Sequence, residues 1–304
     1  MFFQTIRFFR EHRERYNFSL NKLYAALGVT KQAIHKRIDS YKTRTEISIQ
    51  IRLIVHQVRE DHPTMGIRDI YCKIKPELVG RDKFELFCKE MGLMTRKSRF
   101  RPRTTDSNGV IRFPNLLIGL KIIRLDQVWQ SDITYYELNN RFYYLTFILD
   151  AFSRRILGHS VSKSLSTDST TLPALHMAIK TRRQRILPGL ILHSDGGGQY
   201  YAKEFLKLTQ FYKIQNSMCE YPWDNGKAER INGVIKNNYL KHWSIKTYEG
   251  LVKGVDRSVQ LYNSEKPHVE LKRIAPIAFE KNIASLRPQN KPKMTESFDA
   301  KLRT

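Results

Sequence analysis

The chain has 304 residues, and its 53 Lys and Arg against 29 Asp and Glu give a formal net charge of +24. A hydrophobic content of 41% is enough to bury a substantial core, which excludes a wholly disordered chain. Three cysteines exclude a disulfide scaffold, and the apolar runs are too short or too charged for a membrane-spanning helix or a signal peptide.

The basic excess is spread along the chain, because residues 1–120 and residues 121–304 each carry a net charge of +12. This distribution is typical of a protein that contacts a polyanion over its whole length, and we expect double-stranded DNA as the partner. A ribosome-associated protein, or one that is basic only for solubility, is the alternative. We expect a cytoplasmic, nucleoid-associated location and no membrane partner.

Residues 1–45 are predicted to form an N-terminal helix-turn-helix domain. Within residues 18–41, two apolar patterns of helical period are separated by Gly28, which permits a tight turn. Thr30 stands where the N-cap of the second helix is expected. That helix would present a polar face to a DNA major groove, with contacts from Lys31, Gln32, His35, Lys36 and Arg37. An ordinary helical hairpin with a polar face is the alternative.

Residues 46–95 are predicted to form a second DNA-binding module of three short helices. A basic linker, residues 96–125, follows it. The cations at its start are expected to contact DNA phosphates: Arg96, Lys97, Arg99, Arg101 and Arg103. A solvated hinge without a ligand is the alternative.

Residues 126–284 change in character and are predicted to form an α/β domain. Two runs rich in aromatic and β-branched residues, VWQSDITYYEL and RFYYLTFILDAFS, are separated by Asn139-Asn140, which indicates a hairpin. A third strand follows, and helices and strands then alternate, so we expect a mixed sheet with flanking helices. The segment WDNGKAERINGVIKNNYLKHW is predicted as one long helix. Residues 285–304 are expected to form a flexible tail.

Three acidic residues stand at informative positions in this basic domain. Asp132 lies inside the first predicted strand, Asp195 at the end of the fourth, and Glu229 on the long helix. A carboxylate inside an aromatic-rich strand is costly unless it is paired or bound to a metal. If the three converge, they make an oxygen-ligand site suited to Mg²⁺ or Mn²⁺. The spacing does not show convergence, and each residue has a plainer role in a turn, a loop or a helix surface.

Several segments together resemble the catalytic core of DDE-type insertion-sequence transposases, which belong to the retroviral-integrase superfamily. The resemblance covers roughly residues 46–284, and its strength lies in the order and spacing of segments that are weakly specific one by one. The segments are HPTMGIRDIYCKIKPELVGRDKFELFCKEMGL, WQSDITYYELNNRFYYLTFILDAFSRRILGHSVS, LILHSDGGGQYYAKEFLKL, SMCEYPWDNGKAERINGVIKNNYL and LYNSEKPHVELKRIAPIAFE.

The resemblance implies a ribonuclease H-like fold whose three catalytic carboxylates match Asp132, Asp195 and Glu229. It implies that these residues hold two Mg²⁺ or Mn²⁺ ions in each active site. It also implies hydrolysis that frees a 3′-hydroxyl at the end of a mobile element, followed by attack of that hydroxyl on target DNA without a covalent protein intermediate. The need to hold two DNA ends implies a homo-oligomer, a dimer or larger.

The segment before Glu229 departs slightly from the family pattern. Thirty-three residues separate Asp195 from Glu229, which is shorter than the family's usual spacing, so the loop's contacts with DNA are expected to differ. Asn232 and Lys236, three and seven residues beyond Glu229 on the same helix face, are expected to contact DNA. His193 is expected to be a hydrogen-bonded structural residue, and a position near the metals or the substrate is the alternative.

Two other functions stay open on the sequence alone. One is a DNA-binding regulator with an inactive catalytic domain, against which the intact carboxylates argue. The other is a structure-specific nuclease of the same fold without strand transfer. The two predicted N-terminal DNA-binding modules favour recognition of element ends over the nuclease.

Overall fold

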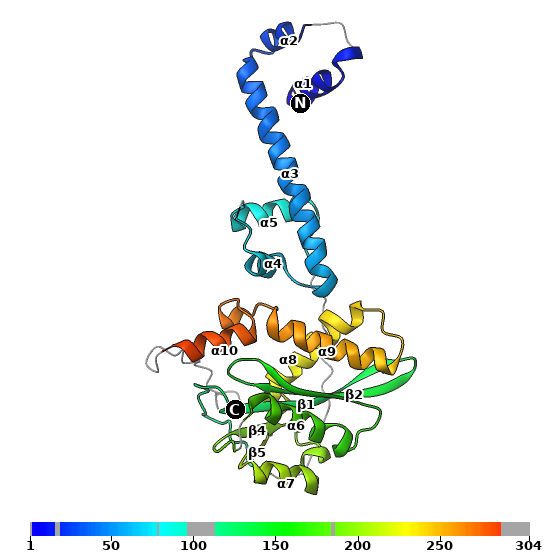
Figure 1. The fold of residues 1–304 in the computed structure, drawn as a ribbon, viewed down its shortest axis with the longest axis vertical. Coiled ribbons are helices and arrows are strands. Elements are labelled where there is room, and N and C mark those ends of the chain that lie inside the picture. Colours follow the sequence, from blue (N-terminus) through cyan, green and yellow to red (C-terminus); the bar gives the residue numbers. More distant parts are fainter. Residues whose placement is uncertain (1, 16–18, 78, 96–112, 184–185, 287–304) are drawn as a thin grey trace. The chain divides into compact units, whose positions relative to one another are not determined.

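The computed structural model describes residues 2–15, 19–77, 79–95, 113–183 and 186–286 (Figure 1). The chain divides into two compact units: residues 1–57 with 78–94, and residues 58–77 with 95–304. The predicted linker cations between Arg96 and Arg103, and residues 287–304 of the predicted tail, lie outside the described residues. None of the helices in the described part is long and apolar enough to cross a membrane.

The first unit is helical. Tyr24 and Ile34 belong to a buried apolar cluster that its helices share. Gly28 has a φ of +65° and makes the turn before the third helix, whose start is capped because Thr30 Oγ1 accepts a hydrogen bond from the Ala33 N–H at 3.2 Å. The pair of helices expected around Gly28 is therefore present, and its DNA-binding role stays a prediction. The elements are α1 (Phe2–Glu11), a 3₁₀ turn (Arg13–Arg15), α2 (Leu20–Ala26), most of α3 (Lys31–Asp61) and α5 (Arg81–Glu90).

Helix α3 is longer than either helix predicted in this region. The predicted domain boundary between residues 45 and 46 falls inside this single helix of 31 residues. Residues 31–61 include no Gly or Pro, so the backbone has no residue that would end the helix. The helix buries Ile38 toward its start and Val55 toward its end, so both halves have an apolar contact face.

Residues 58–77 belong to the second unit and pack on its α/β domain. His62 is buried, its Nδ1 lies 3.1 Å from the Tyr239 hydroxyl, and its Nε2 lies 3.2 Å from a Glu265 carboxylate oxygen. Lys73, in α4 (Ile67–Ile74), also pairs with Glu265. Part of the segment predicted as a second DNA-binding module is thus fastened to the α/β domain.

The second unit is built on a five-stranded mixed sheet with the strand order β3-β2-β1-β4-β5. The first three strands are antiparallel, and β4 and β5 run parallel to β1. Asn139 and Asn140, both with positive φ, form the two-residue turn between β1 and β2. This confirms the predicted ribonuclease H-like sheet. The strands are β1 (Val128–Leu138), β2 (Arg141–Asp150), β3 (Ile156–Ser162), β4 (Ile191–Ser194) and β5 (Gln215–Met218).

Helices cover both faces of the sheet (Figure 1). On one face Trp129 and Ile148 pack against α6 and α7, and on the other Phe147 packs against α8 and α9. The α-helices of this domain are α6 (Thr171–Arg182), α7 (Lys203–Phe211), α8 (Gly226–Val234), α9 (Tyr248–Ser264) and α10 (Pro276–Ser285). Short 3₁₀ turns occupy Thr167–Ser169, Gly198–Tyr200, Pro222–Asn225, Leu240–His242 and Val269–Leu271.

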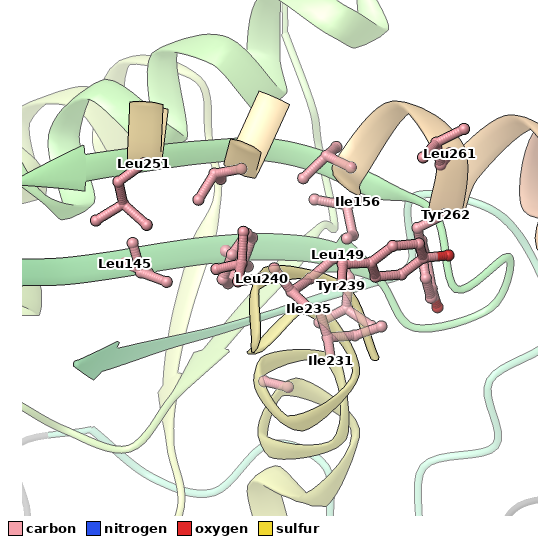
Figure 2. Close-up of a cluster of buried hydrophobic side chains, with 14 of the residues drawn as sticks. Leu145, Leu149, Ile156, Ile231, Ile235, Tyr239, Leu240, Leu251, Leu261 and Tyr262 are labelled. Carbon is pink, nitrogen blue, oxygen red and sulfur yellow. The ribbon is translucent and has the colours of Figure 1, made fainter. Parts of the chain in front are cut away.

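The segment predicted as one long helix changes its winding along its length. A 3₁₀ turn precedes α8, and a π-helical segment, Ile235–Tyr239, follows it. Figure 2 shows why the winding matters: Ile231, Ile235 and Tyr239 all point into the apolar cluster with Leu149 of β2. An ideal α-helix turns 100° per residue, so four-residue steps drift around the axis, and the wider π turn keeps Tyr239 on the buried face.

Gly158 of β3 is the point of closest approach between the sheet and α6. A Cβ on this residue would stand 2.0 Å from the Ala174 carbonyl oxygen and 2.7 Å from the Ala178 nitrogen, both backbone atoms. We expect Gly158→Ala to lower the free energy of unfolding by about 1–3 kcal/mol, because α6 would have to move away. Urea unfolding followed by circular dichroism measures this change.

The control is Gly233→Ala on α8, where the nearest atom would be 3.9 Å from the new Cβ. That variant should be neutral or stabilised by up to about 1 kcal/mol, because alanine is the better helix former. An unchanged stability of Gly158→Ala would contradict the packing described for β3 and α6.

Candidate active site

Asp132 stands in the middle of β1 and is half-buried beside α8. The side-chain amide of Asn232 on α8 donates a hydrogen bond from Nδ2 to Oδ2 of Asp132 at 2.7 Å. Burial, together with the negative charges of Asp195 and Glu229, holds the pKa of Asp132 well above its usual range. Asp132 is therefore within electrostatic reach of both other predicted carboxylates.

Asp195 directly follows β4. Gln130 of β1 is in register with His193 of the parallel strand β4, and continuing this register by two residues brings Asp132 beside Asp195. The backbone N–H of Gly197 donates to Oδ1 of Asp195 at 3.1 Å and fixes the start of the following loop. Desolvation raises the pKa of Asp195 even though the residue reaches solvent.

The loop after Asp195 requires glycine. Gly196 has a φ of +79°, and a Cβ there would stand 2.2 Å from Cε of Met218 on β5. A side chain at this position would meet both a strained backbone and an occupied space. The close approach of the loop to β5 therefore helps to hold Asp195 at the edge of the sheet.

Glu229 lies in the first turn of α8 and is exposed. Burial and the charge of Asp195 raise its pKa. Glu229 and Asn232 are three residues apart on the same side of α8, and Asn232 contacts Asp132, so the helix carries Glu229 to the same place. The structure thus brings together three predicted site residues from a strand, a strand end and a helix.

No group of three or more His, Cys, Asp or Glu side chains in the described part of the chain is arranged so that it could hold a metal ion. The three carboxylates nevertheless have the chemistry of a divalent-cation site, because all their donor atoms are hard oxygens. Desolvation disfavours the charged form of all three carboxylates. Asp132 and Glu229 are also disfavoured in their charged forms by the negative charges of neighbouring carboxylates. A cation beside them would reverse both effects.

Lys236 reaches the same strand from the π-helical segment. Its Nζ donates hydrogen bonds to Thr134 Oγ1 at 2.6 Å and to the Tyr135 carbonyl oxygen at 3.3 Å. Burial and the charge of Lys241 lower the pKa of Lys236, while the charge of Asp132 opposes that shift. The predicted DNA contacts of Lys236 and of the buried Asn232 stay predictions.

His193 is buried in β4, and its Nδ1 lies 2.9 Å from Ser217 Oγ. Burial lowers the pKa of His193 to about 4, against the opposing influence of Asp224, so the ring is neutral at physiological pH. The expected structural role of His193 is thereby confirmed by its hydrogen bond to β5.

Two residues before α8 support the site and were not singled out from the sequence. Asn225 Nδ2 donates to the Ser131 carbonyl oxygen at 2.9 Å and ties the loop to β1. Asp224 Oδ2 accepts the backbone N–H groups of Glu220 and Tyr221 at 3.2 Å each and closes the loop on itself. The Asp-Asn-Gly string was the available signal, because Asp and Asn side chains commonly close turns.

The residues predicted to read a DNA groove lie at the start of α3 in the first unit. His35 is half-buried, and the others are exposed: Lys31, Gln32, Lys36 and Arg37. Their exposure leaves them available to a ligand without identifying one.

Comparison with known proteins finds an integrase core domain and relatives from insertion elements. Two models described as integrase core domain match residues 124–221 and 212–276. The chain is 28% identical over 252 residues to a 31 kDa protein of insertion element IS600 from Shigella sonnei, covering 81% of this chain and 90% of that protein. It is 36% identical over 121 residues to a putative transposase of element IS986/IS6110 from Mycobacterium tuberculosis, covering 38% of this chain and 43% of that protein.

Among solved structures, the catalytic core domain of HTLV-2 integrase in complex with magnesium resembles the chain. The match has a TM-score of 0.41 at 22% sequence identity and covers 54% of this chain and 98% of the integrase domain.

The raised pKa of Asp132 has a consequence for stability. A carboxyl whose pKa is higher in the folded state destabilises the fold progressively as the pH rises above the usual range of Asp. We therefore expect Asp132→Asn, without divalent cations, to raise the melting temperature at pH 7 by roughly 2–4 °C for each kcal/mol relieved. The advantage should shrink toward pH 4, where the wild-type carboxyl is protonated.

Asp168→Asn is the matched control, because Asp168 is an exposed carboxylate of the same unit. Thermal melts of the two variants at several pH values separate a local charge effect from a general one. If Asp132→Asn melted below the wild type at pH 7, the burial of this charge and its repulsion by Asp195 and Glu229 would not be the main effects at the site.

Proposed function

We propose that this chain, which matches integrase core domain models and is similar to insertion-sequence transposases, binds the ends of a mobile DNA element and cleaves and joins DNA strands in a metal-dependent reaction. The observation that carries the proposal is the convergence of Asp132, Asp195 and Glu229 at the edge where β1 and β4 meet. A basic chain of net charge +24 supplies the complementary attraction for DNA.

In the proposed reaction a water molecule attacks the phosphodiester at the element end. A new phosphorus–oxygen bond forms, the bond to the 3′-oxygen breaks, and the DNA end leaves as a 3′-hydroxyl. That hydroxyl then loses its proton to solvent and attacks a phosphodiester of the target. A new phosphorus–oxygen bond forms, the bond to the target's 3′-oxygen breaks, and the displaced oxygen takes up a proton from solvent. The number of phosphodiester bonds is conserved in the second step, so no external energy source is required.

Asp132, Asp195 and Glu229 are the residues that we propose would hold two Mg²⁺ or Mn²⁺ ions. Such ions, when bound, supply charge stabilisation to the attacking and leaving oxygens. Asn232 holds one oxygen of Asp132, and the Gly197 N–H holds one oxygen of Asp195, so both carboxylates are oriented by the fold. The chain's own contribution is this fixed orientation.

A covalent protein nucleophile is not needed for this chemistry. Cys219, the cysteine nearest the carboxylates in sequence, has its pKa raised to about 12 by burial and then by the charge of Asp195. The thiol is therefore protonated at physiological pH and is a poor nucleophile. This supports direct attack by water and by the DNA 3′-hydroxyl.

The remaining parts of the chain are proposed to hold DNA. The start of α3 would enter a major groove through Lys31, Gln32, His35, Lys36 and Arg37. The linker cations and Lys236 would contact phosphates, and Asn232 would adjoin the DNA end. A homo-oligomer, a dimer or larger, would hold two DNA ends at once. The domain division is proposed as well: modules at residues 1–45 and 46–95, a linker at 96–125, a catalytic core at 126–284 and a tail at 285–304.

The test is joining of a labelled element end to plasmid DNA by the full chain. The labelled ends are taken from the DNA that flanks the gene, and Mg²⁺ is present or absent. We expect Glu229→Gln to reduce cleavage and joining by at least about a hundredfold, a loss typical of removing a group that stabilises transition-state charge. Glu249→Gln is the control, since Glu249 is also exposed in the first turn of a helix, α9.

Each alternative function has its own outcome in this assay. A regulator would bind DNA and yield neither product, and a nuclease would yield cleaved ends without joined plasmid. Equal joining by Glu229→Gln and the wild type would contradict the role of that carboxylate.

A further inference from the structure

The outer end of the β1–β2 hairpin exposes an aromatic surface. Tyr135 and Phe142 are 52% and 54% exposed, and their rings meet edge to face with centroids 5.5 Å apart. Tyr144 is directly opposite Tyr135 in the register, so its side chain lies on the same face of the hairpin. We call Tyr135, Phe142 and Tyr144 the hairpin aromatic face.

This exposure is unusual for the sheet to which the hairpin belongs. The opposite face of the same hairpin is covered, because Tyr136 and Tyr143 pack against the apolar cluster beneath α8 and α9. The same face is covered farther along the sheet, where Trp129 and Ile148 pack against α6 and α7. Two exposed aromatic side chains beside the half-buried Tyr144, on an otherwise covered sheet, indicate a binding surface.

A cation stands beside this surface. Lys236 Nζ lies 5.3 Å from the centroid of the Tyr135 ring and also donates to Thr134 Oγ1 at 2.6 Å. In the described part of the sheet, β4 pairs with β1 only at residues 128–130, and beyond that point Lys236 lies against β1. A positive charge next to an exposed aromatic ring suits a ligand that combines negative charge with a flat ring.

The distance to the carboxylates fits a DNA end. Tyr135 is three residues beyond Asp132 on one strand, a separation of ~10 Å along the backbone. That separation corresponds to about three base steps of a duplex strand. A nucleotide at the hairpin aromatic face would therefore lie only a few nucleotides along the strand from the reacting phosphate.

One acidic side chain determines which part of a bound nucleotide, the base or the phosphate, would lie over Phe142. Glu137 is exposed and is directly opposite Phe142 in the register, on the same face. A phosphate over Phe142 would meet this carboxylate, whereas a neutral base stacked on an aromatic ring would not. The charges therefore place the phosphate toward Lys236 and the base over the aromatic rings.

We propose that the hairpin aromatic face, centred on Tyr135, is a stacking site for an unpaired nucleobase at the DNA end. The proposal rests on the proposed function, because it takes the reacting DNA to lie at the three carboxylates. Stacking on an aromatic ring tolerates any base and is strongest for a base already outside a duplex. The site would hold the strand end open beside the reacting phosphate.

The probe is a short duplex that ends in a single-stranded overhang with 2-aminopurine, compared with the same duplex made blunt. We expect the wild-type full chain to bind the overhang more tightly and to quench the 2-aminopurine fluorescence. Tyr135→Leu should lose most of that preference, about tenfold or more in affinity, and the quenching with it. Tyr135→Phe should keep both, because it retains the ring.

Phe211→Leu is the matched control, since Phe211 is 71% exposed on α7 and also meets a tyrosine ring edge to face. It should keep the preference and the quenching. Cross-strand aromatic pairs also stabilise hairpins, so melting temperatures of all variants are measured alongside. If Tyr135→Leu is unstable, the test rests on Tyr135→Phe. Loss of the preference for the overhang in a stable Tyr135→Phe variant would overturn stacking, because that variant keeps the ring.

Three results overturn the proposal. The first is an equal preference for the overhang in Tyr135→Leu and the wild type. The second is no preference in the wild type, even if the wild type joins element ends. The third is a change in oligomeric state of Tyr135→Leu with unchanged binding of the overhang, which would make the face a contact with a second copy. Absence of joining in the wild type, with the preference intact, contradicts the proposed function alone.

Discussion

The desolvation of three neighbouring carboxylates, to which repulsion adds at Asp132 and Glu229, is the constraint on which the rest of the site depends. Asp132 is half-buried and has Asp195 and Glu229 close enough for their charges to raise its pKa. Such an arrangement is unfavourable without a cation, so the surrounding fold has to hold it in place. The sheet and the helices packed on it therefore offset the unfavourable free energy of keeping these carboxylates together, so that they can act on a ligand.

Several neighbouring features meet that requirement. The parallel register of β1 and β4 sets two carboxylates side by side, and the glycine loop after β4 holds the second of them. Asn232 links α8 to Asp132, and the π-helical segment that follows keeps both Tyr239 in the core and Lys236 on β1. His62 reaches the same segment through its contact with Tyr239. The segment that carries Lys236 is thus held from both sides, by β1 and by His62.

The strands, their order of appearance and the hairpin at Asn139-Asn140 were predictable, because period-two patterns and turn residues act locally. The positions of the three carboxylates on their elements were also predictable, but their convergence depends on strand order, which is not local. Two features escaped prediction, and only the second depends on contacts that are distant in sequence. The length of α3 follows from the absence of a helix-ending residue, and the π-helical winding after α8 follows from tertiary contacts of Tyr239. The burial of Asn232 against Asp132 likewise required the packed helix.

Direct measurement of cation binding tests the central role of the carboxylates. Isothermal titration of Mn²⁺ into the full chain would be compared for the wild type, Asp195→Asn and the control Asp168→Asn. We expect Asp195→Asn to weaken binding by about 10–100-fold or more, because it removes an oxygen ligand, and Asp168→Asn to bind as the wild type does. Equal binding of Mn²⁺ by the wild type and Asp195→Asn would contradict the assignment of these carboxylates as the cation site.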